Sequence, residues 1–246
     1  MLAPNAMSRA PSLSVIVINA RRDAHLPACL EGLRAQRSVA LELLLADCGG
    51  DDASPDRLER HRATVDHLVT GAASTAEAAN HALASARGEW ALMLRPDDRL
   101  VGDLVLSECL NWMRTTEAGV VAGEVACNDG RILKLRSQPN AIGGEFLPDS
   151  GTFYRRTLFD EHDRFDTSLQ YMARYDLHLR LWKGRVRFKP IPLRVVATEG
   201  RGLPPWSAAR EEIRVRHRYF GRARSLRSDL VTLLRRALRR PGPPAA

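Results

Sequence analysis

Short, continuous apolar runs alternate with helical stretches in the first hundred residues, and this alternation limits the folds open to the chain. The runs are at residues 13–19 (LSVIVIN), 41–46 (LELLLA), 65–70 and 90–94 (WALML). The helical stretches are near residues 26–36, 55–61 and 75–86. Continuous apolar strands separated by helices are typical of parallel sheets. The sequence therefore predicts an α/β fold, a mostly parallel sheet flanked by helices, with ligands beyond the carboxyl ends of the strands.

The next hundred residues predict a mixed arrangement within the same domain. Helices are expected near residues 103–114 and 174–182, and strands near 120–126, 131–136, 151–154 and 186–196. The sequence Asn128-Asp-Gly130 is a hairpin signal. We expect an α/β core followed by a mixed, substrate-side half.

The positive charge of the chain lies almost entirely at its C-terminal end. The net charge is +8, but residues 201–246 contain 12 arginines against three acidic residues, so residues 1–200 are nearly neutral at −1. We expect a flexible leader at 1–12, one domain at 13–200 and a basic amphipathic helical tail at 201–246. Because the tail lacks interleaved aromatic residues, we expect no nucleic-acid binding.

The tail is predicted to be helical over residues 207–240, with a break at Gly221. Its apolar positions fall on one side of a helix: Leu226, Leu230, Leu233, Leu234, Ala237 and Leu238. Arginines lie largely across from them: Arg235, Arg236, Arg239 and Arg240. Two interpretations remain open. The helix packs on the domain with a solvated basic face, or residues 222–240 lie on an anionic membrane surface.

Cysteine usage and hydropathy bear on the compartment. The four cysteines form no C-x-x-C pair, so neither a zinc site nor a disulfide framework is indicated. No apolar run approaches the roughly 20 residues of a membrane span, and no signal-peptide core is apparent. We expect a cytoplasmic protein, which is peripheral at the inner face of the cell membrane if the tail lies on an anionic membrane surface.

Three polar loops follow predicted strands, at residues 20–23, 47–54 and 95–99. In the last of them, Asp97 and Asp98 could bind a divalent cation and a diphosphate, or form a turn that caps the following helix. Asp47 could bind a ligand N–H or simply end its strand. No G-x-G-x-x-G, G-x-x-x-x-G-K-[ST] or G-x-S-x-G motif is present, which disfavours dinucleotide, P-loop and serine hydrolase chemistry.

Taken in order, four segments of the chain resemble family 2 glycosyltransferases of the GT-A fold. The segments are SVIVINARRD, LLLADCGGDDAS, GAASTAEAANHALASARGEWALMLRPDD and TFYRRTLFDEHDRFDTSLQYMARYDLHLRLW. The resemblance spans about residues 13–220. It implies transfer of a sugar from a nucleotide-sugar donor to a saccharide or lipid-linked acceptor, with inversion, in cell-surface polysaccharide biosynthesis, and it implies Mn²⁺ or Mg²⁺ as cofactor.

The resemblance also implies roles for individual residues. The donor-binding residues are Asn19, Asp47, Asn80, Arg95 and Asp97, of which Asn19 and Asp47 hold the base. The metal ligands are Asp97 and Asp98. Arg95 replaces the first acid of the family's metal motif, and its guanidinium could contact the diphosphate bidentately or repel the metal.

The position of the family's general base is Arg174, which cannot accept a proton. Asp176 is two residues further along a helix, a rotation of about 200° that directs its side chain away. Asp149 replaces a polar site residue on another loop. Two hypotheses remain: an inverting glycosyltransferase assisted by Asp149 or Asp176, or a catalytically degenerate sugar-nucleotide-binding or scaffolding homologue.

Overall fold

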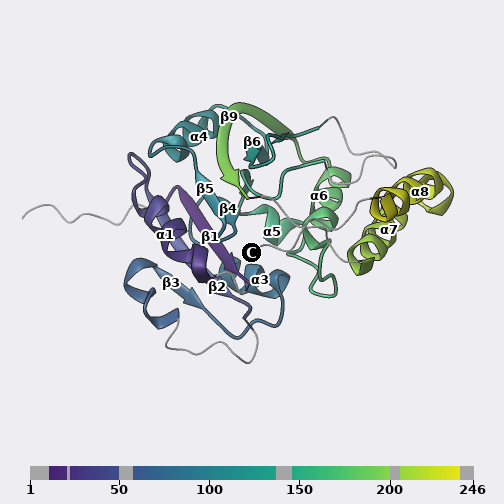
Figure 1. Ribbon diagram of the computed structural model, residues 1–246. Coiled ribbons are helices and arrows are strands. Elements are labelled where there is room, and N and C mark those ends of the chain that lie inside the picture. Colours follow the sequence, from purple (N-terminus) through teal and green to yellow (C-terminus); the bar gives the residue numbers. More distant parts are fainter. Residues whose placement is uncertain (1–10, 21–22, 50–57, 137–145, 200–205, 239–246) are drawn as a thin grey trace, which may run out of the picture.

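The computed structural model contains one large sheet with helices on both faces (Figure 1). The strand order is β3-β2-β1-β4-β8-β6-β9-β5, and β7 pairs with β6. The structure describes residues 11–20, 23–49, 58–136, 146–199 and 206–238. Outside them lie residues 1–10 of the predicted leader, residues 55–57 of the predicted 55–61 helix, and residues 201–205 and 239–246 of the predicted tail.

The parallel half of the sheet confirms the predicted alternation. It consists of β1 (Leu13–Asn19), β2 (Leu41–Asp47), β3 (His67–Val69) and β4 (Trp90–Leu94). β1 pairs in parallel with β2 on one side and with β4 on the other. Every residue of β1 is buried, as expected for a central strand covered on both faces.

Alternate residues of β1 point into two separate cores, one on each face of the sheet. Ile16 and Ile18 belong to the core that includes α3 (Thr75–Ser85). Val15 and Val17 belong to the core that includes α1 (Leu26–Arg34) and α4 (Val105–Arg114). Short 3₁₀ turns precede α1 and β3, at Asp23–His25 and Arg62–Thr64.

The second half of the sheet is mixed, as predicted. Its strands are β5 (Asp98–Leu100), β6 (Val120–Cys127), β7 (Ile132–Leu133), β8 (Thr152–Arg155) and β9 (Phe188–Thr198). Its helices are α5 (Leu158–Glu161) and α6 (Ala173–Lys183). β7 is much shorter than the predicted 131–136 strand. β5 was not predicted: Asp98 pairs with Thr198 in antiparallel fashion, so the polar loop after β4 ends at Asp97.

The tail forms two helices, α7 (Trp206–Phe220) and α8 (Arg222–Leu238), separated at Gly221, which has φ +77°. α7 contacts α6, and α8 packs against α7 at the margin of the molecule (Figure 1). The break at Gly221 confirms the prediction, because glycine readily adopts this left-handed conformation.

α8 packs through its polar side rather than its apolar side. Ser225, Ser228 and Asp229 are buried, and Asp229 accepts a hydrogen bond from Arg216 of α7 at 2.7 Å. The apolar side is exposed, at Leu226 (67%), Leu230 (58%), Leu233 (39%) and Leu234 (48%). The interpretation in which the apolar stripe packs on the domain is therefore wrong for these four leucines, because the buried Arg216 requires the acidic side of α8 as its partner.

Glu42, a buried glutamate of β2, connects β1 with the segment that leads into β4. Glu42, 2% exposed, accepts hydrogen bonds from Ser14 Oγ of β1 at 2.6 Å and from the backbone N–H of Gly88 at 3.0 Å. It also accepts from the backbone N–H of Arg87. A Cβ at Gly88 would lie 2.4 Å from the Ser14 nitrogen, so only glycine allows this approach. The sequence analysis did not identify Glu42.

Replacement of this carboxylate should destabilise the fold in a pH-dependent way. Burial alone would raise the pKa of Glu42, but the hydrogen bonds from Ser14, Arg87 and Gly88 lower it overall from its ordinary 4.5. Because the folded-state pKa is lowered, the contribution to stability is present above pH 4.5 and is lost as the pH falls through the folded-state pKa. We expect Glu42→Gln to reduce the free energy of unfolding by about 2 kcal/mol at pH 7, measured by urea denaturation.

The exposed Glu89, which pairs with Arg155, provides the matched control. Glu89→Gln should change the free energy of unfolding by less than about 0.5 kcal/mol. A Glu42→Gln deficit that stays constant as the pH falls from 7 to below the folded-state pKa would contradict the proposed role of the charge.

Candidate active site

The carboxyl ends of β1 and β2 bring together two of the predicted donor-binding residues. Asn19 and Asp47 end these strands in register, and Asn19 Nδ2 donates a hydrogen bond to Asp47 Oδ1 at 2.8 Å. Asp47 Oδ2 accepts from the backbone N–H of Gly49 at 3.0 Å. Both side chains are buried. The residues on either side of Asn19, Ile18 and Ala20, line a pocket at this edge of the sheet.

Arg95, Asp97 and Asp98 form a compact charged cluster at the end of β4. Arg95 Nη2 lies 3.5 Å from Asp97 Oδ2 and 3.6 Å from Asp98 Oδ1, and it donates to Thr198 Oγ1 at 2.9 Å. Asp98 Oδ2 accepts from the backbone N–H of Arg95 at 2.8 Å and from the Ser150 hydroxyl. Both carboxylates are fully buried. Of the three side chains, only Arg95 lines the pocket.

This cluster does not fit a divalent cation in the observed arrangement. A cation shared by Asp97 and Asp98 would take the place of the Arg95 guanidinium. A second guanidinium, Arg99, donates to the backbone carbonyls of Pro96 and Asp98. Two carboxylates and two guanidiniums balance in charge, and no group of three or more potential metal ligands occurs among the residues that the structure describes. The predicted metal role of Asp97 and Asp98 therefore lacks support from the geometry.

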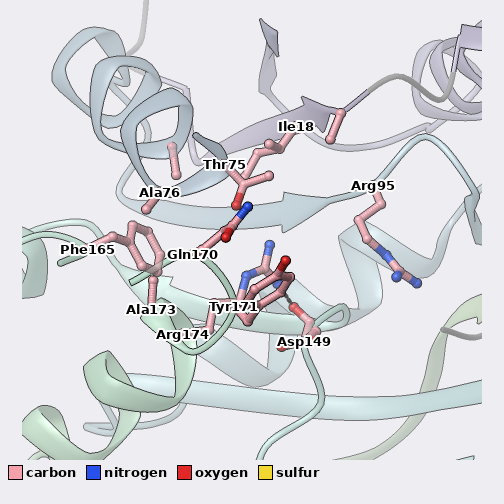
Figure 2. Close-up of a pocket in the computed structure, with 12 residues that line it drawn as sticks. Ile18, Thr75, Ala76, Arg95, Asp149, Phe165, Gln170, Tyr171, Ala173 and Arg174 are labelled. Carbon is pink, nitrogen blue, oxygen red and sulfur yellow. Dashed lines mark hydrogen bonds between the residues drawn. The ribbon is translucent and has the colours of Figure 1, made fainter. Parts of the chain in front are cut away.

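The pocket lies between the end of β1, the start of α3 and the segment leading into α6 (Figure 2). Its polar lining consists of Thr75, Arg95, Asp149, Gln170, Tyr171 and Arg174. Its apolar lining includes Ile18, Ala76, Ala79, Phe165 and Ala173. Asp149 is the one carboxylate among the described residues that line the pocket, and the guanidiniums of Arg95 and Arg174 line the same pocket. The pocket is therefore suited to an anionic ligand with a polar, uncharged portion.

Arg174 and Asp149 are in direct contact within the pocket. The Arg174 guanidinium donates to the backbone carbonyl of Asp149 (Figure 2). One turn further along α6, His178 is buried, and this burial lowers its pKa to about 3. Its Nε2 lies 2.6 Å from the Tyr154 hydroxyl. His178 is therefore a neutral packing residue, and Asp149 is the residue of this group whose carboxylate belongs to the pocket lining.

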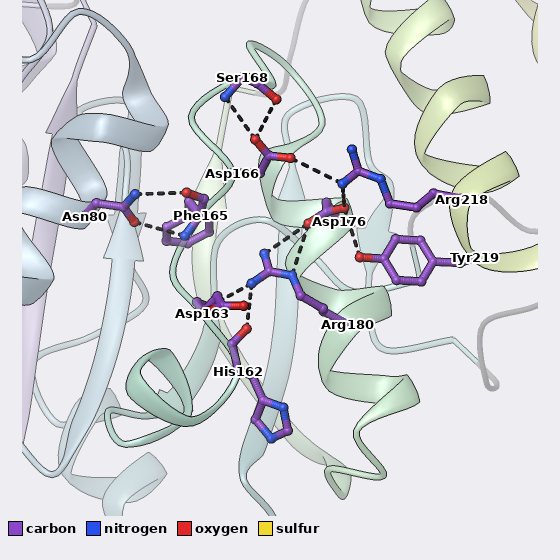
Figure 3. Close-up of polar contacts among 10 residues, drawn as sticks. All are labelled: Asn80, His162, Asp163, Phe165, Asp166, Ser168, Asp176, Arg180, Arg218 and Tyr219. Atoms are coloured by element: carbon purple, nitrogen blue, oxygen red, sulfur yellow. Dashed lines mark hydrogen bonds and ion pairs between the residues drawn. The ribbon is translucent and has the colours of Figure 1, made fainter.

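Asn80 lies beside the pocket and supports its wall. Its Nδ2 donates to the backbone carbonyl of Phe165 at 2.9 Å, and its Oδ1 accepts from the Phe165 N–H at 2.9 Å (Figure 3). Both polar atoms of the Asn80 amide therefore bond to the backbone of Phe165. The structure does not bring the Asn80 side chain into the pocket; Phe165 lines it instead.

Asp176 faces the tail and does not line the pocket. It is 1% exposed. Oδ2 accepts from Arg180 at 3.0 and 3.2 Å, and Oδ1 accepts from Arg218 at 2.9 Å and Tyr219 at 3.0 Å (Figure 3). Because its carboxylate is occupied by these donors and the residue does not line the pocket, Asp176 is not placed to act as a base there. The geometry therefore does not favour the predicted catalytic role, because the helical rotation directs Asp176 toward α7.

Three polar residues of the pocket were missed by sequence reasoning: Thr75, Gln170 and Tyr171. The Glu211 carboxylate of α7 accepts from the backbone N–H groups of Gln170, Tyr171 and Met172, at 3.1, 2.8 and 3.1 Å. The tail therefore fixes the segment that leads into α6. The available signal was weak: Glu211 is one of three acidic residues among the arginines of the tail.

The family model for glycosyl transferase family 2 matches residues 14–179. The chain belongs to this family. PGL/p-HBAD biosynthesis glycosyltransferases of Mycobacterium tuberculosis and Mycobacterium bovis are 28% identical to it in an alignment of 193 residues that covers 70% of this chain and 70% of theirs. The sequence resemblance to family 2 is thus confirmed.

Solved structures support the same fold. Staphylococcus aureus TarS 1-349 in complex with UDP-GlcNAc aligns with a TM-score of 0.66 at 16% identity, over 83% of this chain and 64% of that chain. Mycobacterium tuberculosis glucosyl-3-phosphoglycerate synthase, in complex with Mn²⁺, UDP and glucosyl-3-phosphoglycerate, aligns with a TM-score of 0.58 at 18% identity, over 92% and 80%. The chain spans less than two thirds of the TarS chain. The predicted GT-A-like α/β fold is confirmed.

Removal of the Asp176 charge should affect stability more than ligand binding. We expect Asp176→Asn to lower the free energy of unfolding by about 3 kcal/mol, because Arg180 and Arg218 lose a buried partner, while the affinity for UDP or GDP below the unfolding transition changes less than about twofold. Urea denaturation and calorimetric titration give the two values. Asp166→Asn is the control, since Asp166 shares Arg218 but is less buried. Unchanged stability with lost glycosyl transfer would instead assign Asp176 to catalysis.

Proposed function

We propose that this chain is an inverting glycosyltransferase that transfers a sugar from a nucleoside diphosphate to a hydroxyl of a saccharide or lipid-linked acceptor, in cell-surface polysaccharide biosynthesis. The proposal rests on one pocket, at the carboxyl edge of the parallel strands, that contains both Arg95 and Asp149. A guanidinium suits diphosphate oxygens, and a carboxylate suits proton transfer. Family membership and relatives that bind UDP-GlcNAc or UDP support the donor class.

The nucleobase and the diphosphate of the donor each have a complementary group in this proposal. The Asn19–Asp47 pair binds the nucleobase, with Asp47 as an acceptor for a base N–H. Arg95 binds the diphosphate. Asp97 and Asp98 hold the Arg95 guanidinium in place, and Asn80 positions the Phe165 wall. The acceptor enters on the side of Asp149 and Arg174.

Asp149 accepts the proton of the acceptor hydroxyl in the proposed reaction. The hydroxyl oxygen bonds to the anomeric carbon of the donor sugar as the bond from that carbon to the phosphate oxygen breaks. The nucleoside diphosphate leaves with the electron pair, and Arg95 stabilises its developing charge. A single displacement of this kind inverts the configuration at the anomeric carbon.

Arg174 favours a second candidate function. Its guanidinium occupies the place of the family's general base and contacts Asp149 through the backbone. If Asp149 does not accept the acceptor proton, the chain is a sugar-nucleotide-binding or scaffolding homologue without turnover.

Asp149→Asn should separate the two functions. We expect the wild-type protein to hydrolyse or transfer at least one donor from a panel of UDP- and GDP-sugars, and we expect the variant to lower kcat by about 10²- to 10⁴-fold. UDP or GDP affinity should change less than about twofold, because the amide preserves the shape of the side chain. Product formation is measured by release of the nucleoside diphosphate.

Asp129→Asn, in the exposed β6–β7 turn, is the matched control and should retain full activity. Nucleotide-sugar binding with no turnover across the panel would support the non-catalytic function. Full activity of Asp149→Asn would remove Asp149 from the mechanism.

We further propose that α8 places the protein on an anionic membrane surface, peripherally at the inner face of the cell membrane. Leu226, Leu230, Leu233 and Leu234 form an exposed stripe, and Arg224 and Arg227 are exposed on the same helix. Apolar insertion combined with about 1 kcal/mol per arginine near anionic headgroups gives reversible binding. Within the described part of the chain, no helix has the length and apolar character needed to cross a bilayer. The four free cysteines suit a reducing compartment.

Membrane binding should depend on the leucine stripe and on anionic lipid. We expect the protein to co-sediment with phosphatidylglycerol vesicles but not with phosphatidylcholine vesicles, and we expect added salt to weaken the binding. Leu230→Glu with Leu234→Glu should abolish it. Ile132→Glu, which also places a charge at an exposed apolar position, should bind normally. Equal binding to both vesicle types would refute the proposal.

A further inference from the structure

The charged cluster at the end of β4 places an arginine side chain against its two carboxylates. The side chain of Arg95 is 17% exposed, and those of Asp97 and Asp98 are 0% exposed. The guanidinium lies against both carboxylates, so the two acids face it from within the protein while its accessible portion lines the pocket. The buried anions thus direct one fixed positive charge at the ligand.

The cluster is also fixed in position. Asp98 accepts from the backbone N–H of Arg95 and from the Ser150 hydroxyl. Arg95 donates to Thr198 on β9, and Asp98 pairs with the same Thr198 in the sheet. Both hydrogen bonds hold the Asp98 carboxylate through Oδ2, and Oδ1 faces the Arg95 guanidinium at 3.6 Å. The arrangement is therefore preorganised around the guanidinium rather than around an ion.

Arg95 retains donor capacity for a ligand. A guanidinium has five N–H donors. The Nε of Arg95 is buried, and the guanidinium contacts Thr198, Asp97 and Asp98 through Nη2, so the N–H groups of Nη1 remain for a ligand in the pocket that Arg95 lines. Diphosphate oxygens are strong acceptors that pair with arginine bidentately. A divalent cation brought to the same place would be repelled by Arg95 and by Arg99.

We propose that Arg95 takes the place of a divalent cation at the donor diphosphate, so that donor binding and transfer need no metal. This inference rests on the proposed function, because it concerns the diphosphate of the same donor. It differs from the Mn²⁺ or Mg²⁺ requirement that the sequence resemblance implies. It also assigns Asp97 and Asp98 as positioning residues that act through Arg95.

The first experiment uses the wild-type protein and needs no substitution. UDP, GDP, UMP and GMP are titrated calorimetrically in EDTA and in MnCl₂. We expect UDP or GDP to bind with affinities that agree within about twofold in the two buffers, because Arg95 supplies the charge. Loss of nucleoside diphosphate binding in EDTA, with recovery in MnCl₂, would overturn the inference and leave the proposed function intact. If no nucleotide binds in either buffer, the proposed function itself fails, and the inference with it.

The second experiment asks whether Arg95 is the source of the charge. We expect Arg95→Ala to weaken UDP or GDP binding by at least about tenfold, which is the effect of one lost charge-assisted contact, and to change UMP or GMP binding less than about twofold. Arg95→Lys keeps the charge without the planar fork and should lie in between, which retains a readout if Arg95→Ala does not fold. Arg131→Ala, an exposed arginine of the β6–β7 turn, is the control. An equal loss for monophosphates and diphosphates would assign Arg95 to folding rather than to the diphosphate.

Discussion

The parallel pairing of β1 with β2 and β4 is the constraint on which the rest of the structure depends. Parallel strands end at the same edge of a sheet. The register of β1 therefore places Asn19 opposite Asp47 and brings the residue after β4, Arg95, to the same edge. Burial on both faces fixes that register, since a shift of one residue would exchange the two cores that β1 separates.

The pocket depends on charges that are balanced within the protein. Buried carboxylates are costly unless they are paired, and here each has an arginine partner. Asp97 and Asp98 face Arg95, and Asp176 faces Arg180 and Arg218. The first group directs a cation into the pocket. The second joins α6 to α7 and keeps its carboxylate out of the pocket. Ion pairs of the same type therefore place a charged group in the pocket in one case and keep one away from it in the other.

The tail is both a part of the domain and a surface element. α7 is tied to the pocket because Glu211 caps the segment before α6 and Arg218 reaches Asp176. α8 is tied to α7 through the buried Arg216–Asp229 pair. Because the polar side of α8 is used for this contact, its leucines are left on the outside. Arg218, one of the arginines that make the tail basic, thus contacts α6 through Asp176.

The sequence by itself determined the order of strands and helices in the parallel half, because apolar runs and turn residues are local signals. It also located Asn19, Asp47, Arg95 and Asp149 through the resemblance of their segments to family 2. It did not reveal β5, Glu42 or the roles of Asn80 and Asp176. Those depend on which groups meet across 28 to 103 residues of chain, as in the contacts of Glu42 with Ser14 and of Arg95 with Thr198. Tertiary structure decided which charges face the pocket, because a carboxylate is a base, a metal ligand or a structural anchor according to the partners that the fold places beside it.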